Sequence, residues 1–504
     1  MCAVKIGWAK RDISTTEPVN INGQMYLRMN EGIHDPISVT ALVIDGGEGQ
    51  DAAIFVSCDL TSIVEEVKVL SREKVAAKDP QIPVKNIVLN ATHTHSSSAT
   101  FKTAEKSPDG KDIYPGEKYR EFATDQIADA VCEAWKTRKE GGIAYGYGYA
   151  VVGHSRRVIY SEDQGGADAN AAPNGFGVMY GSTKKPAFSH YEAGADHFLN
   201  VMFTVDANKK LTGMIINVPC PSQLSEHFTK LSADYWCEVR EAVAAEYGED
   251  VFVLAQCAAA GDLSPRILHY GKAQSRRMEL KYGLGYETKG MVRNGAEEYK
   301  KVMGERKDIA ERIMNGVRDI YGWAMKDIQT DVTVRHVGEV VWLPRRNITE
   351  AEYEECQANL KKLEESLPDP ETMSAEEYRV AMSRNASFTN RNKTAIKRYG
   401  FLKTDPALDY EIHVTQIGEI AFASNPFELY QDFMHRIQAR SPFIQTFITQ
   451  LAGDGGACYV PTKRGEFNKG YSASIFCNAV GSEGGQTLVE YTLKVLNEMK
   501  AKDE

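Results

Sequence analysis

The sequence has no long apolar run, because none of its hydrophobic stretches approaches the roughly 18 residues that span a membrane. The first residues, from Met1 to Trp8, also lack the charged stretch and apolar core of a secretory signal. The nine cysteines are scattered and form no C-x-x-C pair, as is typical of reduced thiols. We therefore expect a cytoplasmic protein without stable membrane association.

An excess of basic residues is also missing. The 59 lysines and arginines are outnumbered by 69 acidic residues, which gives a formal net charge of -10. Nucleic-acid binding usually requires a basic face, so we expect no nucleic-acid partner. Hydrophobic residues make up 42% of the chain, which is enough for a sizeable buried core. A globular protein that binds a small-molecule substrate fits this composition.

Strand-like apolar runs alternate with helical patterns along most of the chain. This alternation predicts an α/β fold of layered, mixed sheets with flanking helices. The helical patterns cover Gly116–Lys136, Asp234–Tyr247 and a final helix at Gln486–Lys500. The predicted strands are Ala52–Ser57, Asn86–Ala91, Leu211–Val218, Val251–Gln256, Val332–Leu343, His413–Ile417 and Glu419–Ala423.

The segment 349–397 differs from the rest because it is strongly charged and poor in strand-forming residues. Thr349 with Glu352, and Ser374 with Glu377, have the spacing of helix capping boxes. The pattern predicts an inserted helical hairpin, which is either an interaction element that supports a homo-oligomer or a solvated surface insertion. Residues 1–348 and 398–504 then form one α/β catalytic domain around it.

The sharpest chemical signal is the sequence Thr92-His93-Thr94-His95 directly after a predicted strand. Residues two apart in a strand point the same way, so His93 and His95 are expected to lie side by side at the strand exit. Ligands collect at the carboxyl ends of strands in such sheets. The pair can bind a metal or polarise a carbonyl; two hydrogen-bonded structural histidines are the alternative.

Cys220 follows the predicted strand Leu211–Val218 and lies between two prolines that restrain its backbone. A thiolate at this position would be a strong zinc ligand. A small buried cysteine explains the residue equally well.

Further candidates follow two later strands. In Gly261-Asp262-Leu263-Ser264-Pro265, Ser264 is held on a sharp turn as a nucleophile or hydrogen-bond partner, although an ordinary turn capped by Asp262 has the same sequence. Glu428 can act as a metal ligand or general base, or simply favour a helix start. Tyr459 can polarise a carbonyl or pack in the interior.

These elements occur together with several others in one order along most of the chain. The most specific are Thr92-His93-Thr94-His95 and Gly261-Asp262-Leu263-Ser264-Pro265. The others are Gly32-Ile33-His34, Val56-Ser57-Cys58-Asp59-Leu60, Ser155-Arg156-Arg157, Ser232-Ala233-Asp234, Pro426-Phe427-Glu428 and Tyr459-Val460-Pro461-Thr462. In this arrangement the sequence resembles the neutral (non-lysosomal) ceramidase family, and the resemblance implies a zinc-dependent amide hydrolase.

The resemblance assigns roles to individual residues. It implies that His93 and Glu428 bind zinc, that His95 lies beside the substrate, and that Ser264 is catalytic or orients the substrate.

It also implies that an arginine contacts the substrate. We assign Arg156 to the catalytic site, and Arg157 and Asp262 to substrate binding. Tyr459 is the candidate for the tyrosine that completes the metal site, while a second tyrosine position of the motif falls near Gly456.

The sequence departs from the family pattern where the family has its second zinc histidine, because Cys220 stands there. Either Cys220 replaces that ligand or the metal site is altered. We also expect neither the secretion signal nor the C-terminal β-sandwich domain of the family. Without them we expect a small soluble amide or ester as the substrate rather than ceramide.

Other functions remain compatible with these residues. Metallo-β-lactamase-like hydrolases also carry H-x-H, but the aspartate and histidine that follow it there are replaced by Ser96, Ser97 and Ser98. Amidohydrolase barrels carry the motif as well. A lyase or isomerase reaction at a modified metal site, or a non-catalytic binding role, are the remaining alternatives.

Overall fold

The computed structural model describes residues 4–164, 175–283, 296–453 and 458–503. Its largest sheet is mixed: the pairs β5/β6 and β13/β14 are parallel and its other neighbours are antiparallel. In sheet order the strands are β14 (Phe252–Cys257), β13 (Leu211–Val218), β12 (Phe198–Asp206), β7 (Lys139–Tyr149), β1 (Lys5–Asp12), β4 (Ser38–Asp45), β5 (Ala52–Cys58) and β6 (Ile87–Ala91).

This sheet divides into two halves, because β1 and β7 pair only through Lys5 with Glu140 and Ile6 with Lys139. A separate four-stranded sheet contains β16 (Val334–Pro344), β17 (Ala407–Ile417), β18 (Ile420–Ser424) and β20 (Gln445–Thr449). The central apolar core takes side chains from both halves and from this sheet. Its members include Leu42, Phe55, Ile215, Leu254, Ile420, Phe422 and Phe447.

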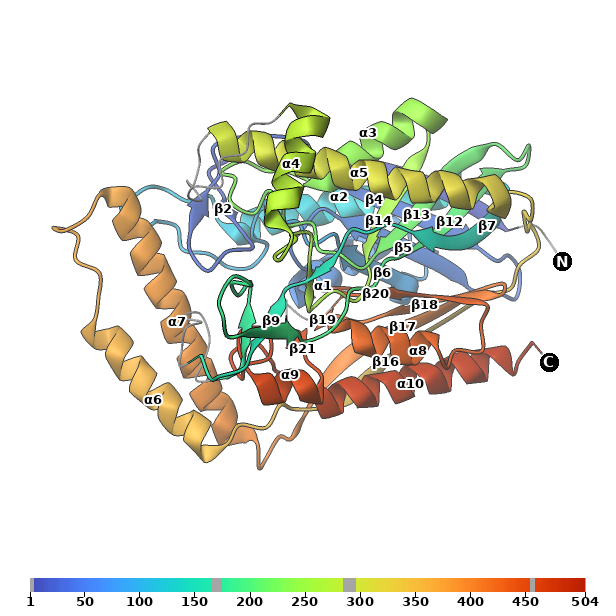
Figure 1. Ribbon diagram of the computed structural model, residues 1–504. Coiled ribbons are helices and arrows are strands. Elements are labelled where there is room, and N and C mark those ends of the chain that lie inside the picture. The colour runs from blue at the N-terminus through green and yellow to red at the C-terminus, as the bar shows by residue number, and fades with distance from the viewer. Residues whose placement is uncertain (1–3, 165–174, 284–295, 454–457, 504) are drawn as a thin grey trace.

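Helices cover the outer faces of the sheets (Figure 1). The helices pack in three pairs, and each pair shares a buried apolar cluster with the strands beneath it. No helix in the described ranges is long and apolar enough to span a membrane. The pairs are α1 (Glu65–Lys78) with α2 (Gly116–Thr137), α3 (Tyr235–Tyr247) with α5 (Ala296–Ala324), and α8 (Gln431–Gln438) with α10 (Ser482–Lys500).

The inserted helical hairpin consists of α6 (Glu350–Glu365) and α7 (Ala375–Phe401), which stand at one side of the molecule in Figure 1. Both predicted capping boxes are formed, at Thr349 with Glu352 and at Ser374 with Glu377. The second helix runs beyond the predicted end at residue 397. The layered α/β fold with mixed sheets, flanking helices and an inserted hairpin is therefore confirmed.

Shorter elements connect these layers and carry several candidate residues. They are β2 (Asn20–Ile21), β3 (Arg28–Met29), η1 (Val84–Asn86), β8 (His154–Ser155), β9 (Arg157–Tyr160), β10 (Gly177–Met179), β11 (Phe188–Tyr191), β15 (Leu263–Ser264), α4 (Gly271–Tyr282), β19 (Glu428–Leu429), β21 (Tyr459–Val460) and α9 (Lys463–Asn468).

The carboxyl ends of three parallel strand pairs meet at one place. Asn90 of β6 donates from Nδ2 to the carbonyl of Ala255 in β14 at 3.1 Å. The Ala91 amide donates to the Leu451 carbonyl beyond β20 at 3.1 Å, and the Gln450 amide donates to the Cys257 carbonyl at 3.0 Å. These cross-links bring the segments that follow β6, β14, β18 and β20 together, and the candidate site lies there.

Candidate functional site

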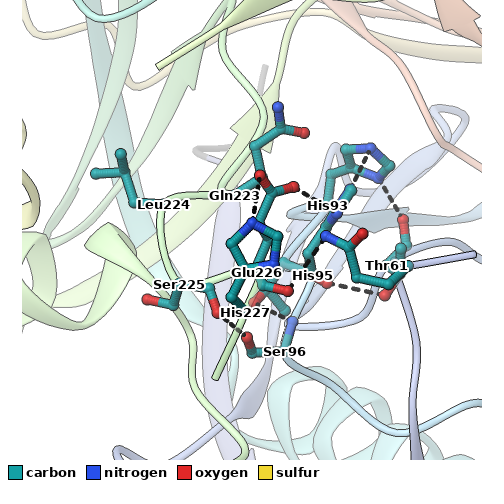
Figure 2. A network of polar contacts seen from close by, with 12 residues as sticks. Thr61, His93, His95, Ser96, Gln223, Leu224, Ser225, Glu226 and His227 are labelled. Carbon is teal, nitrogen blue, oxygen red and sulfur yellow. Dashed lines mark hydrogen bonds and ion pairs between the residues drawn. The ribbon is translucent and has the colours of Figure 1, made fainter. Parts of the chain in front are cut away.

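His93 and His95 come together, as the sequence predicts. The Nε2 atoms of the two imidazoles are 3.2 Å apart and the rings meet edge to face (Figure 2). The strand ends earlier, at Ala91, so the pairing comes from the turn that follows it. His93 donates from Nδ1 to the Thr61 carbonyl at 2.6 Å, which leaves its Nε2 as the atom that faces the site.

The backbone of His93 has a φ of 61°, in the left-handed region that residues other than glycine rarely adopt. The hydrogen bond to Thr61 and a bond from the Thr92 amide to the Cys58 carbonyl, at 2.9 Å, hold this turn. Strained conformations of this kind are found at functional sites, where the surrounding structure determines them.

Glu428 faces His93 from the other sheet. Its Oε2 is 3.2 Å from Nε2 of His93, and both side chains are almost fully buried. In the parallel pair β19/β21, Glu428 lies opposite Tyr459, so the carboxylate and the phenol are neighbours. Burial alone would raise the pKa of Glu428, but His93 and the Arg156 guanidinium hold it below its usual value.

Arg156 closes this group. Its Nη2 is 3.6 Å from Glu428 and donates to the Tyr459 hydroxyl at 3.3 Å and to the Gly261 carbonyl at 2.9 Å. The same guanidinium donates from Nη1 to the Tyr180 hydroxyl at 3.3 Å, while its buried Nε has no hydrogen-bond partner. The predicted catalytic residues Arg156 and Tyr459 therefore lie with His93, His95 and Glu428 in one cluster.

Glu226 is a site residue that the sequence analysis missed. Its Oε2 lies 3.5 Å from Nδ1 of His95 (Figure 2), and it forms a close ion pair with Arg266. Arg266 holds the pKa of Glu226 well below its usual value despite burial. Burial in turn lowers the pKa of His95 to about 4, so this imidazole is neutral near pH 7.

Tyr471 is a second residue that the sequence analysis did not single out. Its ring packs edge-on against Tyr459, with the ring centroids 5.6 Å apart. Burial is the main cause that raises the pKa of its hydroxyl, and the nearby Glu428 carboxylate adds to it. The motif position near Gly456 lies outside the described residues, so the tyrosine found beside Tyr459 is Tyr471.

Ser264 and Asp262 are both buried. The Ser264 hydroxyl accepts from the Arg266 amide at 3.2 Å, so it supports the residue that pairs with Glu226. Asp262 accepts from the backbone and side chain of Gln431, at 3.1 and 3.0 Å, so both of its carboxylate oxygens have internal partners. The substrate-binding role of Asp262 and the role of Ser264 stay predictions.

Arg157 does not suit the predicted substrate contact. It is fully buried and forms a two-pronged ion pair with Glu192, at 2.6 and 2.9 Å. Its remaining donors bind the carbonyls of Tyr471 and Lys469, each at 2.7 Å. Because every donor is used internally, Arg157 holds the segment that carries Tyr471 instead of contacting a substrate.

Cys220 is also not where a zinc ligand is needed. Its side chain belongs to the apolar core under α3 and α5, and its thiol donates to the Pro221 carbonyl at 3.5 Å. Burial raises the pKa of this thiol well above its usual value, which disfavours a thiolate. The alternative of a small buried cysteine agrees with this position.

The fit of a zinc ion can be judged from the donor atoms. Across the described ranges, no three His, Cys, Asp or Glu side chains form a group that could hold a metal ion. Two ligands of a tetrahedral zinc lie about 3.3–3.5 Å apart, however. The His93 Nε2 and Glu428 Oε2 atoms, at 3.2 Å, nearly meet this condition. The residues therefore fit zinc if Tyr459 supplies a third ligand.

Comparison with known proteins gives a result at the level of structure. No protein-family profile and no curated protein matches the sequence. Neutral ceramidase from Pseudomonas aeruginosa has a TM-score of 0.63 and 18% identity, over 99% of this chain and 75% of its own. A ceramidase complexed with C2 has a TM-score of 0.65 and 16% identity, over 100% of this chain and 76% of its own. The chain therefore has the fold of these ceramidases.

Proposed function

We propose that this chain, with its neutral-ceramidase fold, is a zinc-dependent hydrolase of small soluble amides or esters. The observation that carries the proposal is the 3.2 Å approach of His93 Nε2 to Glu428 Oε2, with Arg156 and Tyr459 against the same carboxylate. In this proposal His93, Glu428 and Tyr459 hold the metal, and Cys220 does not. Zinc supplies Lewis acidity, which polarises a carbonyl and acidifies water.

The remaining residues have defined tasks in such a reaction. Arg156 presents a donor where negative charge develops on the carbonyl oxygen, the kind of stabilisation that an oxyanion hole provides. His95 is placed to accept or donate a proton at Nε2, with Glu226 fixing its ring from the Nδ1 side.

The depth of the site supports a small substrate. His93, Arg156 and Glu428 are at most 3% exposed. A compact amide reaches such a position more readily than a ligand that must leave a membrane. Hydrolysis of long-chain ceramide in preference to short N-acyl amides would contradict this part of the proposal.

Metal content distinguishes the residues that bind zinc from those that do not. Purified wild-type protein, His93→Ala and Cys220→Ala should be compared by elemental mass spectrometry after zinc is supplied, together with hydrolysis of a panel of N-acyl amides. We expect about one zinc per chain in wild type and in Cys220→Ala, and loss of zinc and hydrolysis in His93→Ala. Full zinc content in His93→Ala would show that the ligand assignment is wrong.

A further inference from the structure

The helix α7 lies against two sides of the candidate site. At one side the Leu27 amide donates to the Ser383 hydroxyl at 3.0 Å, and the Arg384 guanidinium stacks 5.4 Å over the Tyr26 ring. Two turns further on, Arg391 lies 5.4 Å over the Tyr471 ring. Residues seven apart share one face of a helix, about 10.5 Å along its axis. This face of α7 is therefore turned towards the site.

From the Tyr26 ring below Arg384, a series of contacts continues to His95. The Tyr26 hydroxyl is 3.4 Å from Nδ1 of His227, and Nε2 of His227 is 3.8 Å from Glu226. Glu226 in turn faces His95. The contacts below Arg391 lead through Tyr471 to Tyr459 and Glu428. Arg384 thus marks the His95 end of the site and Arg391 the Glu428 end.

Arg384 carries a charge that the described residues do not match. It is half-buried, and its contact within the described ranges is the uncharged Tyr26 ring. Glu226, the carboxylate that these contacts reach through Tyr26 and His227, already lies in the field of two other arginines, Arg266 and the buried Arg28. An unmatched cation beside a site stands out in a chain with a formal net charge of -10.

We propose that Arg384 binds an anionic group of the substrate, so that the preferred substrate is an amide that also carries a carboxylate. A guanidinium binds a carboxylate through two parallel hydrogen bonds, and stacking on Tyr26 fixes its plane for that contact. One buried atom close to Glu226 in sequence, Oε1 of Gln223, lacks a hydrogen-bond partner in the described residues, as expected of a site that binds a polar ligand. This inference rests on the proposed amide hydrolysis.

The test compares two amides that differ only in their terminal group, a carboxylate in 4-(hexanoylamino)butanoate and a methyl group in N-butylhexanamide. Wild type, Arg384→Gln and Lys393→Gln are assayed with both, the last being an exposed cation on the same helix. We expect wild type to prefer the acid by roughly tenfold or more in kcat/KM, mainly through KM. Arg384→Gln should abolish this preference with little change in kcat for the neutral amide, and Lys393→Gln should retain it.

The outcomes separate this inference from the proposed function. Equal hydrolysis of both amides by wild type, or a preference that survives Arg384→Gln, would overturn the role of Arg384 and leave amide hydrolysis standing. If wild type cleaves neither amide, the proposed hydrolysis of such amides fails. The acid is then titrated calorimetrically, and an absent or Arg384-independent affinity overturns the inference as well.

Discussion

Glu428 and Tyr459 lie opposite each other in the two-residue parallel pair β19/β21, with Arg156 in contact with both side chains. The pair joins a segment that follows β18 to a segment that follows β20. Two strand exits of one sheet therefore deliver the carboxylate and the phenol, while His93 arrives from the other sheet. The chemistry depends on how the two sheets pack against each other.

Tyr459→Phe tests the phenol directly. The substitution keeps the ring against Tyr471 and removes the hydroxyl next to Arg156 and Glu428. We expect zinc content and hydrolysis to fall together, because the phenol is one of the three proposed metal ligands. Tyr119→Phe is the control, because it removes a buried hydroxyl that binds the Ile13 carbonyl at 2.8 Å, in another core. Near-normal turnover in Tyr459→Phe would show that the hydroxyl has no part in the reaction.

Ser264→Ala separates metal binding from turnover. The hydroxyl accepts from the Arg266 amide and is not among the proposed metal ligands. We expect zinc content to be unchanged and kcat/KM to fall by roughly tenfold, because the pairing of Arg266 with Glu226 is loosened. Ser71→Ala, which removes a buried hydroxyl in α1 without a hydrogen-bond partner, is the matched control. Unchanged turnover in Ser264→Ala would exclude a role in the chemistry.

The buried ion pair of Arg157 and Glu192 predicts a large effect on stability. Arg157→Met leaves a buried carboxylate without its partner, so we expect a loss of about 3–5 kcal/mol in the free energy of unfolding, measured with denaturant. The double variant Arg157→Met/Glu192→Met should recover part of that loss. Arg440→Met, which opens an exposed pair with Glu490, should change the unfolding midpoint little. A single-variant loss as small as that of Arg440→Met would contradict the structural role.

His336 predicts how stability depends on pH. It lies 3.1 Å from Nδ1 of His413 and 2.9 Å from the Thr415 hydroxyl. Burial, then His413 and the Arg72 cation, lower its pKa to about 3, and the opposing pull of Glu411 is weaker. The unfolded chain binds a proton near pH 6.5 and the folded chain does not, so stability is present above pH 6.5 and falls from there to about pH 3.

The expected slope from His336 is up to about 1.4 kcal/mol per pH unit within that range. Urea unfolding of wild type and His336→Gln at pH 7 and pH 5 measures it, with the exposed His190→Gln as the control. His336→Gln should lose less stability between the two pH values than wild type does. The same loss in both proteins would mean that another group is responsible.

Elements with a strong local signal could be predicted from the sequence. The strand Leu211–Val218 has the predicted bounds, and both hairpin helices begin at their capping boxes. The long helix α5 was missed, although Ile309, Ile313 and Val317 form a buried stripe at a spacing of four residues. Its many charged residues mask this stripe.

The site could be predicted only where residues adjoin a strand end. Strand geometry predicts that His93 and His95 lie side by side, yet a turn with a left-handed residue brings them together. Glu226 and Tyr471 lie in loops without a local motif, and their positions depend on contacts between segments far apart in sequence. Cys220 adjoins a strand end but does not belong to the site, because its side chain packs in the apolar core.

The backbone at His93 has a thermodynamic consequence. A left-handed conformation costs a residue with a side chain roughly 1–2 kcal/mol, and glycine would avoid this cost. His93→Gly would therefore relieve the backbone strain of the turn while it removes the imidazole. The chain therefore carries a local backbone cost at the position that presents a ring nitrogen to Glu428.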